Sequence, residues 1–299
     1  MGPGHLATRK GAALLIAALS LWASVAQAGT PTPTIAIVID DMGDRLRSGM
    51  RAVNLDGAVT CAILPGTPYA RPLAEAAHGR GKEVMLHLPM EATDDHPLGP
   101  GAVTLHMTRN EFVRTVTQDI DSLPYISGIN NHMGSLITRH PGHMQWLMEL
   151  MQSYPDLFFL DSRTTVKSVA QRIAREFDIP NTRRDVFLDD DPSPEAVARQ
   201  FERLIEIAKR KGTAVGIGHP HGSTLSLLEQ RLPGLTEREG VRLVPVSQII
   251  SQQSAEGRLW HASLSPLRKV AKNLKPSPLS ICCAAPASKS LAPALKLVR

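Results

Sequence analysis

The chain has 299 residues, which is enough for one large domain or two small ones. Its formal net charge is +5, but the positive charge is concentrated at the two ends of the chain. Two basic residues precede position 29, and eight basic residues against one acidic residue follow position 253, so residues 29–253 carry a net charge of −4. We therefore expect no nucleic-acid partner, because a basic face on the folded part is missing. Cys61 lies in an apolar run, and Cys282 and Cys283 are adjacent, so no disulfide framework is expected.

The first 28 residues have the features of a secretory signal peptide. A basic segment at Arg9 and Lys10 precedes an apolar run at 11–25, and residues 26–28 form an A-x-A cleavage site. We expect cleavage after Ala28 and a periplasmic or secreted protein. The alternative is an uncleaved membrane anchor, which the missing stop-transfer pattern disfavours. No later segment is long and apolar enough to predict a transmembrane span.

Residues 29–34 form a linker rich in Pro and Thr, and strands and helices alternate after it. We expect strands at 35–39, 58–64, 83–87, 127–130, 157–161, 185–188, 213–217 and 241–244. Helices are expected at 68–80, 109–120, 141–151, 166–177, 194–211, 223–231 and 246–251, with a long loop at 92–108. Alternation of this kind indicates βαβ units and a mostly parallel sheet. Residues 35–253 are thus predicted to be an α/β domain, an incomplete (β/α) barrel of seven or eight units.

Residues 254–299 differ in composition from the predicted barrel. They are rich in Ser, Pro, Ala and Lys, which predicts a disordered, basic, low-complexity tail. The alternative is that this tail contacts an anionic surface, either a membrane or a wall polymer.

Polar side chains that can bind metal end or follow five of the predicted strands. The active site of a parallel α/β fold lies at the carboxyl ends of its strands, so these side chains are expected to meet. They are Asp40-Asp41, His87 with Glu91, Asn130-Asn131-His132, Asp161-Ser162-Arg163, and Gly218-His219-Pro220-His221. Any one of them could be a turn residue, a helix cap or half of an ion pair. The convergence of Asp and His from distant segments indicates a site.

The residue types favour a catalytic metal site. Carboxylates and imidazoles with no thiolate nearby suit Zn²⁺, with Mn²⁺, Fe²⁺ and Co²⁺ as alternatives. Of two adjacent carboxylates, one can bind the ion while the other accepts a proton from bound water. His87 and Glu91 can offer a nitrogen and an oxygen to the same ion. Arg163 is expected to pair with Asp161 or to orient Asp40.

Five segments together resemble the divergent polysaccharide deacetylase family, a branch of the NodB-type deacetylase superfamily. They are IAIVIDDMG, MLHLPME, GINNHMGS, FFLDSRTT and GIGHP, and the resemblance covers residues 34–252. It implies an incomplete (β/α) barrel with a metal held by Asp and two His. It also implies that Asp40 is the general base, Asp41 a metal ligand and His219 the general acid.

The second motif of the superfamily has two histidines four residues apart, and here the chain departs from it. His87 matches the first histidine, but Glu91 stands at the position of the second. Either Glu91 binds the metal, or His132 from the next strand end completes the site. We favour His132, with Glu91, Asn131, Asp161 and Arg163 as supporting residues or, for Glu91, as a substitute ligand.

The resemblance implies a metal-dependent hydrolase that removes acetyl groups from N-acetylated amino sugars of an envelope polysaccharide. Sugar sites usually display aromatic rings, and only 4% of this chain is aromatic, with Trp146 and Tyr125 as the candidates. Two alternatives follow from this and from the altered motif. One is an envelope binding or scaffolding protein that keeps the metal site without turnover, and the other is a hydrolase of a different amide or ester.

Overall fold

The computed structural model describes residues 31–264. The predicted signal peptide at 1–28 and the part of the predicted tail beyond residue 264 lie outside the described residues. Within the described part, no helix has both the length and the apolar composition needed to cross a bilayer.

The core of the structure is one sheet in which every strand pair is parallel. Its strands are β1 (Thr34–Met42), β2 (Thr60–Ile63), β3 (Glu83–Met90), β4 (Ile126–Met133), β5 (Phe158–Asp161), β6 (Asn181–Arg183), β7 (Val186–Phe187), β8 (Thr213–Gly218) and β9 (Arg242–Leu243). Eight of them pair in the order β6-β5-β4-β3-β2-β1-β8-β7, while β9 pairs with β1. This order is that of a barrel read around its circumference.

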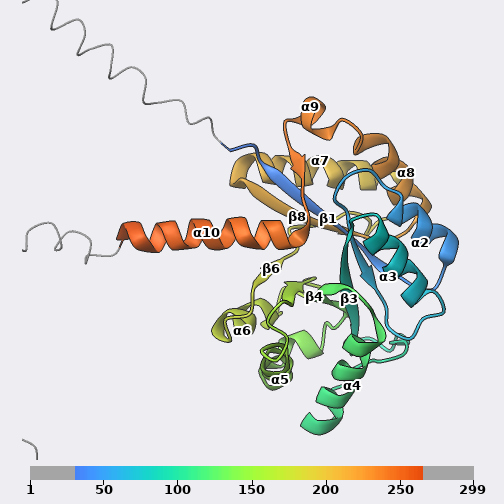
Figure 1. Ribbon diagram of the computed structural model, residues 1–299, viewed down its shortest axis with the longest axis vertical. Coiled ribbons are helices and arrows are strands. Elements are labelled where there is room, and N and C mark those ends of the chain that lie inside the picture. Colours follow the sequence, from blue (N-terminus) through green and yellow to red (C-terminus); the bar gives the residue numbers. More distant parts are fainter. Residues whose placement is uncertain (1–30, 265–299) are drawn as a thin grey trace, which may run out of the picture. The chain divides into compact units, whose positions relative to one another are not determined.

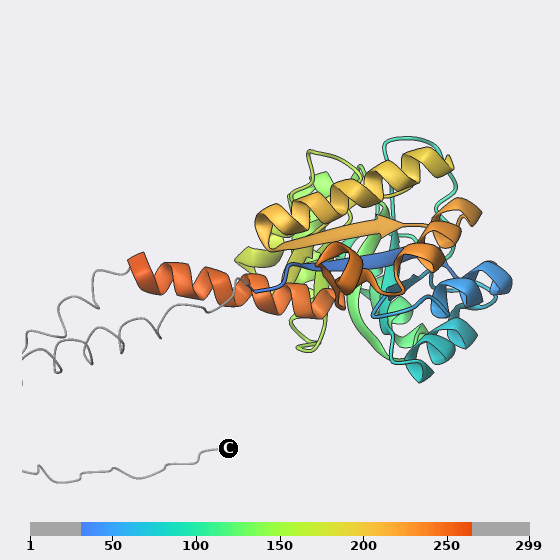
Figure 2. The ribbon, with the colours of Figure 1, turned by 90° about the horizontal axis from the view of Figure 1, so that it is seen from above.

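Helices alternate with these strands along the chain, as the sequence predicts. They are α2 (Leu46–Val53), α3 (Ala70–Gly79), α4 (Arg109–Ser122), the 3₁₀ turn η1 (Ile137–Arg139), α5 (Pro141–Met151), α6 (Ala170–Glu176), α7 (Pro194–Lys211), α8 (Gly222–Arg231), α9 (Leu235–Glu239) and α10 (Val246–Leu264). The start of α4 is fixed by a capping box between Thr108 and Glu111. In Figure 2, α7 lies along β8. The side chain of Leu204 in α7 packs directly against Gly216 in β8.

The barrel is incomplete at one seam, between β6 and β7. These two strands are consecutive in the chain but lie at opposite ends of the pairing order. Only Arg184 and Asp185 separate them, and so short a link spans at most about 11 Å. The two sheet edges therefore curl close to each other without pairing, which confirms the predicted incomplete (β/α) barrel (Figure 1).

Alternate side chains along the strands form two separate apolar cores. Residues such as Ala36 and Val38 in β1 pack inside the barrel, whereas Ile35 and Ile37 pack against the surrounding helices. The inner core also receives the start of α10, whose backbone N–H groups at Val246 and Ser247 donate to the Glu83 carboxylate. Because Glu83 begins β3, this helix start lies at the amino end of the barrel, and the opposite end is left for polar residues.

Several predicted boundaries change in the structure. The sequence did not indicate α2, β6 or α9, and β3 and β4 each extend three residues beyond the predicted strand ends, to Met90 and Met133. The predicted helix at 246–251 was too short, because α10 continues to Leu264 and so includes the first part of the segment expected to be a disordered tail.

Candidate metal centre

Two adjacent aspartates lie near the end of β1, and a local irregularity lets both reach one site. Successive side chains of a strand point to opposite faces, so Asp40 and Asp41 would ordinarily diverge. Here the pairing of β1 with β2 is irregular between Ile39 and Met42, and Asp41 has a φ of +52°. Irregularities of this kind re-aim a side chain. The left-handed conformation of Asp41, uncommon outside glycine, fits a functional position.

Asp41, His87 and His132 form a compact group, called here the Asp41 cluster. Asp41 Oδ1 lies 2.8 Å from His132 Nδ1 and 3.1 Å from His87 Nε2, and the two ring nitrogens are 3.2 Å apart. Three atoms that each bind one ion at about 2.0–2.1 Å lie roughly 3 to 3.5 Å from one another. The spacing and the donor types of the cluster therefore fit a single divalent ion.

Asn130 holds His87 in the tautomer that a metal ligand needs. His87 Nδ1 donates to Asn130 Oδ1 at 2.9 Å, which leaves Nε2, 3.1 Å from Asp41 Oδ1, as the nitrogen that would bind a metal. The amide nitrogen of Asn130 donates to Asp40 Oδ1 at 2.8 Å and to Ser162 Oγ at 3.2 Å. Metal-bound histidines ordinarily donate their other N–H to such a partner, so this hydrogen bond supports a metal site.

Asp40 is buried beside the Asp41 cluster. Its Oδ1 accepts the hydrogen bond from Asn130, while its Oδ2 lies 3.7 Å from His87 Nε2. Burial raises the pKa of the Asp40 carboxyl, and the charges of His87 and His219 oppose that rise. A carboxylate with a raised pKa is better matched to accept a proton near neutral pH.

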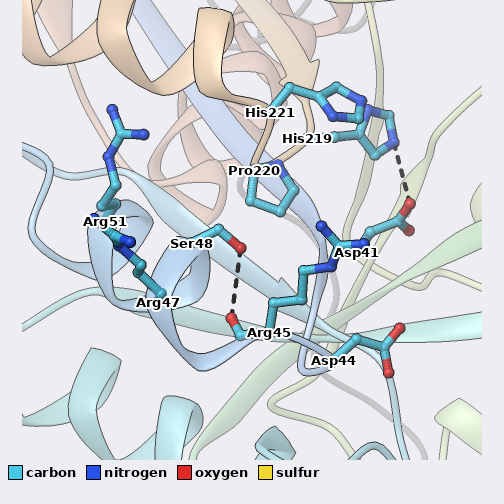
Figure 3. A pocket seen from close by; sticks show the side chains of 9 residues that line it. All are labelled: Asp41, Asp44, Arg45, Arg47, Ser48, Arg51, His219, Pro220 and His221. Atoms are coloured by element: carbon cyan, nitrogen blue, oxygen red, sulfur yellow. Dashed lines mark hydrogen bonds and ion pairs between the residues drawn. The ribbon is translucent and has the colours of Figure 1, made fainter.

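His219 follows β8 and is held by Asp189, which follows β7. His219 Nδ1 donates to Asp189 Oδ1 at 2.9 Å, and its Nε2 lies 3.7 Å from Asp41 Oδ2 (Figure 3). Asp189 Oδ2 accepts from the His219 backbone N–H and from Thr224 Oγ1. Burial alone would lower the pKa of His219, but the Asp189 hydrogen bond and the charges of Asp41 and Asp40 raise it to about 9. These contacts favour the protonated imidazole.

A second group with ligand-like spacing consists of Asp189, His219 and His221. Here the Asp189 carboxylate and His219 Nδ1 already satisfy each other by a hydrogen bond, and His221 is exposed. The Asp41 cluster is the stronger candidate for a metal, because all three of its ligand atoms lie within 3.2 Å of one another and none of its residues is exposed.

Glu91, the predicted substitute ligand, has a different partner. It directly follows β3, and its Oε2 accepts a hydrogen bond from the backbone N–H of Leu105, in the loop at 92–108. Its own backbone N–H donates to Val103 O in the same loop. Glu91 thus ties this loop to the barrel, and the structure groups His132 rather than Glu91 with the other two ligands.

Two further predicted supporting residues, Asn131 and Asp161, face away from the Asp41 cluster. Asn131 accepts from the Ser162 backbone N–H and donates to Met133 O. Asp161 accepts from the Arg163 backbone N–H and from Ser168 Oγ. Both side chains fix the chain after β4 and β5, so their support of the site is indirect.

The predicted ion pair of Arg163 with Asp161 or Asp40 is wrong for the described residues. The Arg163 guanidinium instead donates to Val166 O at 3.4 Å, and only the backbone N–H of Arg163 contacts Asp161. A φ of +49° at Arg163 turns the chain away after β5. The side chain therefore lies outside the cluster that it was expected to orient.

The arginine whose charge acts on Asp40 is Arg184, in the link between β6 and β7. Its guanidinium donates to Ser162 O at 2.6 Å and to Arg163 O at 2.7 Å, and it lies 4.8 Å from the centre of the Phe187 ring. Burial lowers the pKa of Arg184, while the negative charge of Asp40 opposes that shift. Sequence reasoning missed Arg184 because it follows β6, a strand that the sequence did not indicate.

Sequence reasoning also missed the roles of Asn130 and Asp189. The signal for Asp189 was present, because three aspartates directly follow the strand predicted at 185–188. Polar residues that follow the other predicted strands are the expected site candidates, and the same criterion would have identified Asp189.

Comparisons with known proteins identify the family of the chain. The family model described as "Divergent polysaccharide deacetylase" matches residues 37–250. The uncharacterised protein YibQ of Escherichia coli K12 is 35% identical over 248 residues, covering 81% of this chain and 77% of its own. An uncharacterised protein of Haemophilus influenzae is 36% identical over 203 residues, covering 68% and 72%.

A solved structure supports the fold. An uncharacterised protein of Agrobacterium tumefaciens superposes with a TM-score of 0.70 at 20% identity, covering 75% of this chain and 92% of that one. The resemblance seen in the five sequence segments is confirmed by the family match. The chain belongs to the divergent polysaccharide deacetylase family.

Proposed function

We propose that this chain is an exported, metal-dependent deacetylase that removes acetyl groups from N-acetylated amino sugars of an envelope polysaccharide. One observation carries the proposal: the Asp41 cluster lies at the same barrel edge as a buried carboxylate, Asp40, and an imidazole held by a carboxylate, His219. Family membership supports the reaction class. Zn²⁺ suits the donor set best, with Mn²⁺, Fe²⁺ and Co²⁺ as the alternatives.

Asp41, His87 and His132 would hold the ion. When bound, a divalent ion supplies Lewis acidity toward the acetamide carbonyl and lowers the pKa of water. Asn130 and Asp40 contribute by fixing His87, since Asn130 ties its Nδ1 to the Asp40 carboxylate. The ligand set leaves positions for water and substrate, which distinguishes catalytic sites from structural ones.

Asp40 is proposed as the general base. Asn130 occupies Oδ1, so Oδ2 is the oxygen that can accept a proton from the attacking water. Burial makes the protonated product of this transfer less costly, because it disfavours the charged carboxylate.

His219 is proposed as the general acid. Asp189 holds Nδ1, which leaves the N–H at Nε2 directed toward the Asp41 side of the site. That proton can stabilise the negative charge on the carbonyl oxygen and then pass to the leaving amine. The products are acetate and a free amino sugar.

The test is acetate release from acetylated amino-sugar polymers by the full chain, with Zn²⁺, Mn²⁺ or Co²⁺ added. Asp40→Asn should keep its metal and lose activity by about a hundredfold or more. Asp95→Asn, which changes an exposed loop carboxylate, is the matched control and should keep full activity. Metal binding without acetate release from any polymer would instead favour the scaffolding alternative. Activity that persists in Asp40→Asn would show that Asp40 is not the base.

Export is part of the proposal and rests on the sequence of residues 1–28 alone. Mass spectrometry of the protein from its native cells should give a mature chain beginning at Gly29. A chain that retains residues 1–28 would contradict cleavage and favour the membrane-anchor alternative.

A further inference from the structure

A cavity of about 600 Å³ opens beside the candidate metal centre. Asp41 and His219 form its inner wall (Figure 3). The remaining lining residues come from α2, from the two residues before it and from the segment after β8: Asp44, Arg45, Arg47, Ser48, Arg51, Pro220 and His221. A substrate group bound in this cavity would therefore lie next to the acetamide being hydrolysed.

Three arginines line the outer wall of the cavity, and only one of them forms an ion pair within the described residues. Arg51 is already committed, because its Nε and one terminal nitrogen each donate to the Glu229 carboxylate at 2.9 Å. Arg45 and Arg47 are exposed, and in the described part of the chain they form no ion pair, including with Asp44 on the same wall. Two guanidinium groups are thus available beside the site of a domain whose net charge is −4.

The backbone adds to this positive character. Helix α2 begins at Leu46 with Arg45 as its N-cap, no side chain caps it, and its first turn holds no acidic residue. The free N–H groups of a first turn and the helix dipole both favour an anion. Arg45, which begins this helix, lines the cavity together with Arg47.

Aromatic recognition is absent from this wall, since no Trp, Tyr or Phe lines the cavity in the described residues. The two rings expected as sugar platforms lie elsewhere. Tyr125 precedes β4, at the amino end of the barrel, and stacks on His78. Trp146 in α5 packs edge-on against Phe112. Recognition at this wall must therefore rely on charge and hydrogen bonds.

We propose that Arg45 and Arg47 bind an anionic oxyacid group, a carboxylate or a phosphate, carried by the polysaccharide close to the acetylated amine. The planar guanidinium offers paired N–H donors that match both groups. This inference rests on the proposed function, and it narrows the substrate to an acidic glycan.

The test compares three oligosaccharides of equal length: neutral N-acetylglucosamine oligomers, the same oligomers carrying a uronate-type carboxylate, and the same carrying a phosphate. The measured quantity is the ratio of kcat/KM for each acidic substrate to that for the neutral one. The wild-type ratio should exceed one and should fall as NaCl is raised, because salt screens exposed charges. In Arg45→Gln/Arg47→Gln the ratio should fall by about tenfold, the factor that corresponds to about 1.4 kcal/mol.

Arg210→Gln, which removes an exposed arginine of α7, is the matched control and should keep the wild-type ratio. The arm with the larger ratio identifies the source of the anion as carboxylate or phosphate. Equal ratios in the wild type and the double variant, or a wild-type ratio of one in both acidic arms, would overturn the inference.

Failure of the proposed function is separable from failure of this inference. If no oligosaccharide is hydrolysed, the anionic subsite can still be tested by binding. Calorimetry would measure the affinity of the same three compounds for Asp40→Asn and for Asp40→Asn/Arg45→Gln/Arg47→Gln. Tighter binding of an acidic compound that is lost with the two arginines supports the anionic subsite. Equal binding of all three compounds overturns it.

Discussion

Replacing Asn130 with alanine should weaken both the metal site and the fold. The change leaves His87 Nδ1 and Asp40 Oδ1 without their partner, and both residues are at most 3% exposed. Each unpaired buried group costs about 1–3 kcal/mol, so the free energy of unfolding of the metal-free protein should fall by roughly 2–6 kcal/mol. Loss of the bond that orients a ligand histidine typically lowers metal affinity by about 10–100-fold.

The neighbouring residue provides a matched control. Asn131→Ala removes an equally buried amide whose hydrogen bonds go to Ser162 N–H and Met133 O rather than to the site. Urea denaturation should show a comparable loss of stability in both variants, and competition with a chelator should show weakened metal binding in Asn130→Ala alone. Equal metal affinities in the two variants would refute the role given to Asn130.

Three further predictions test other parts of the account. Asp41→Ala/His87→Ala should bind no metal at concentrations that saturate the wild type, and undiminished metal content would remove these two as ligands. Burial raises the pKa of Asp119 to about 7 from its ordinary 3.8, so the folded state holds this proton more tightly. Urea denaturation should therefore show stability falling as pH rises from 3.8 to about 7. Asp119→Asn should flatten that fall, and an unchanged pH profile would contradict this. Gly128→Ala would place a Cβ 2.5 Å from the Phe158 ring inside the barrel, so it should destabilise the protein by about 1–3 kcal/mol in the same assay. An unchanged free energy of unfolding would show that the packing around Gly128 has room for a methyl group, which would contradict this prediction.

The barrel could be predicted from the sequence because its strands are continuous apolar runs separated by helices of ordinary length. The missed elements lack such a signal. Helix α2 is short, uncapped and contains Gly49, which normally disfavours a helix. Tertiary packing reverses this preference, because a Cβ on Gly49 would collide with Leu73 of α3. The glycine that weakens the local signal is what allows the two helices to approach.

The site could be predicted only to the level of strand ends. The alternation of side chains would have taken the prediction further, because Asn130 and His132 share the inner face of β4 while Asn131 faces outward. The same reasoning places Asp161 outside the barrel, one residue after Leu160 of the inner core. The alternation of side chains along β4 and β5 is therefore enough to separate the residues at the site from their immediate neighbours.

Asp41 could not have been placed in this way. By alternation from Asp40 it should face outward, and it reaches the site only through the irregularity in β1 and its positive φ. Such a conformation depends on the surrounding structure, not on the residue's own preference. The chemistry of two adjacent carboxylates and the resemblance to a known family, rather than the strand pattern, indicated that both aspartates act together.

Metal content measured on His132→Ala and Glu91→Ala tests the central claim most directly, because the sequence leaves open which of these two residues completes the site. Both changes remove a side chain that can bind metal at the carboxyl end of the barrel. The account predicts about one ion per chain in the wild type and in Glu91→Ala, and strongly reduced metal in His132→Ala. Full metal content in His132→Ala together with its loss in Glu91→Ala would contradict the Asp41 cluster as the metal centre.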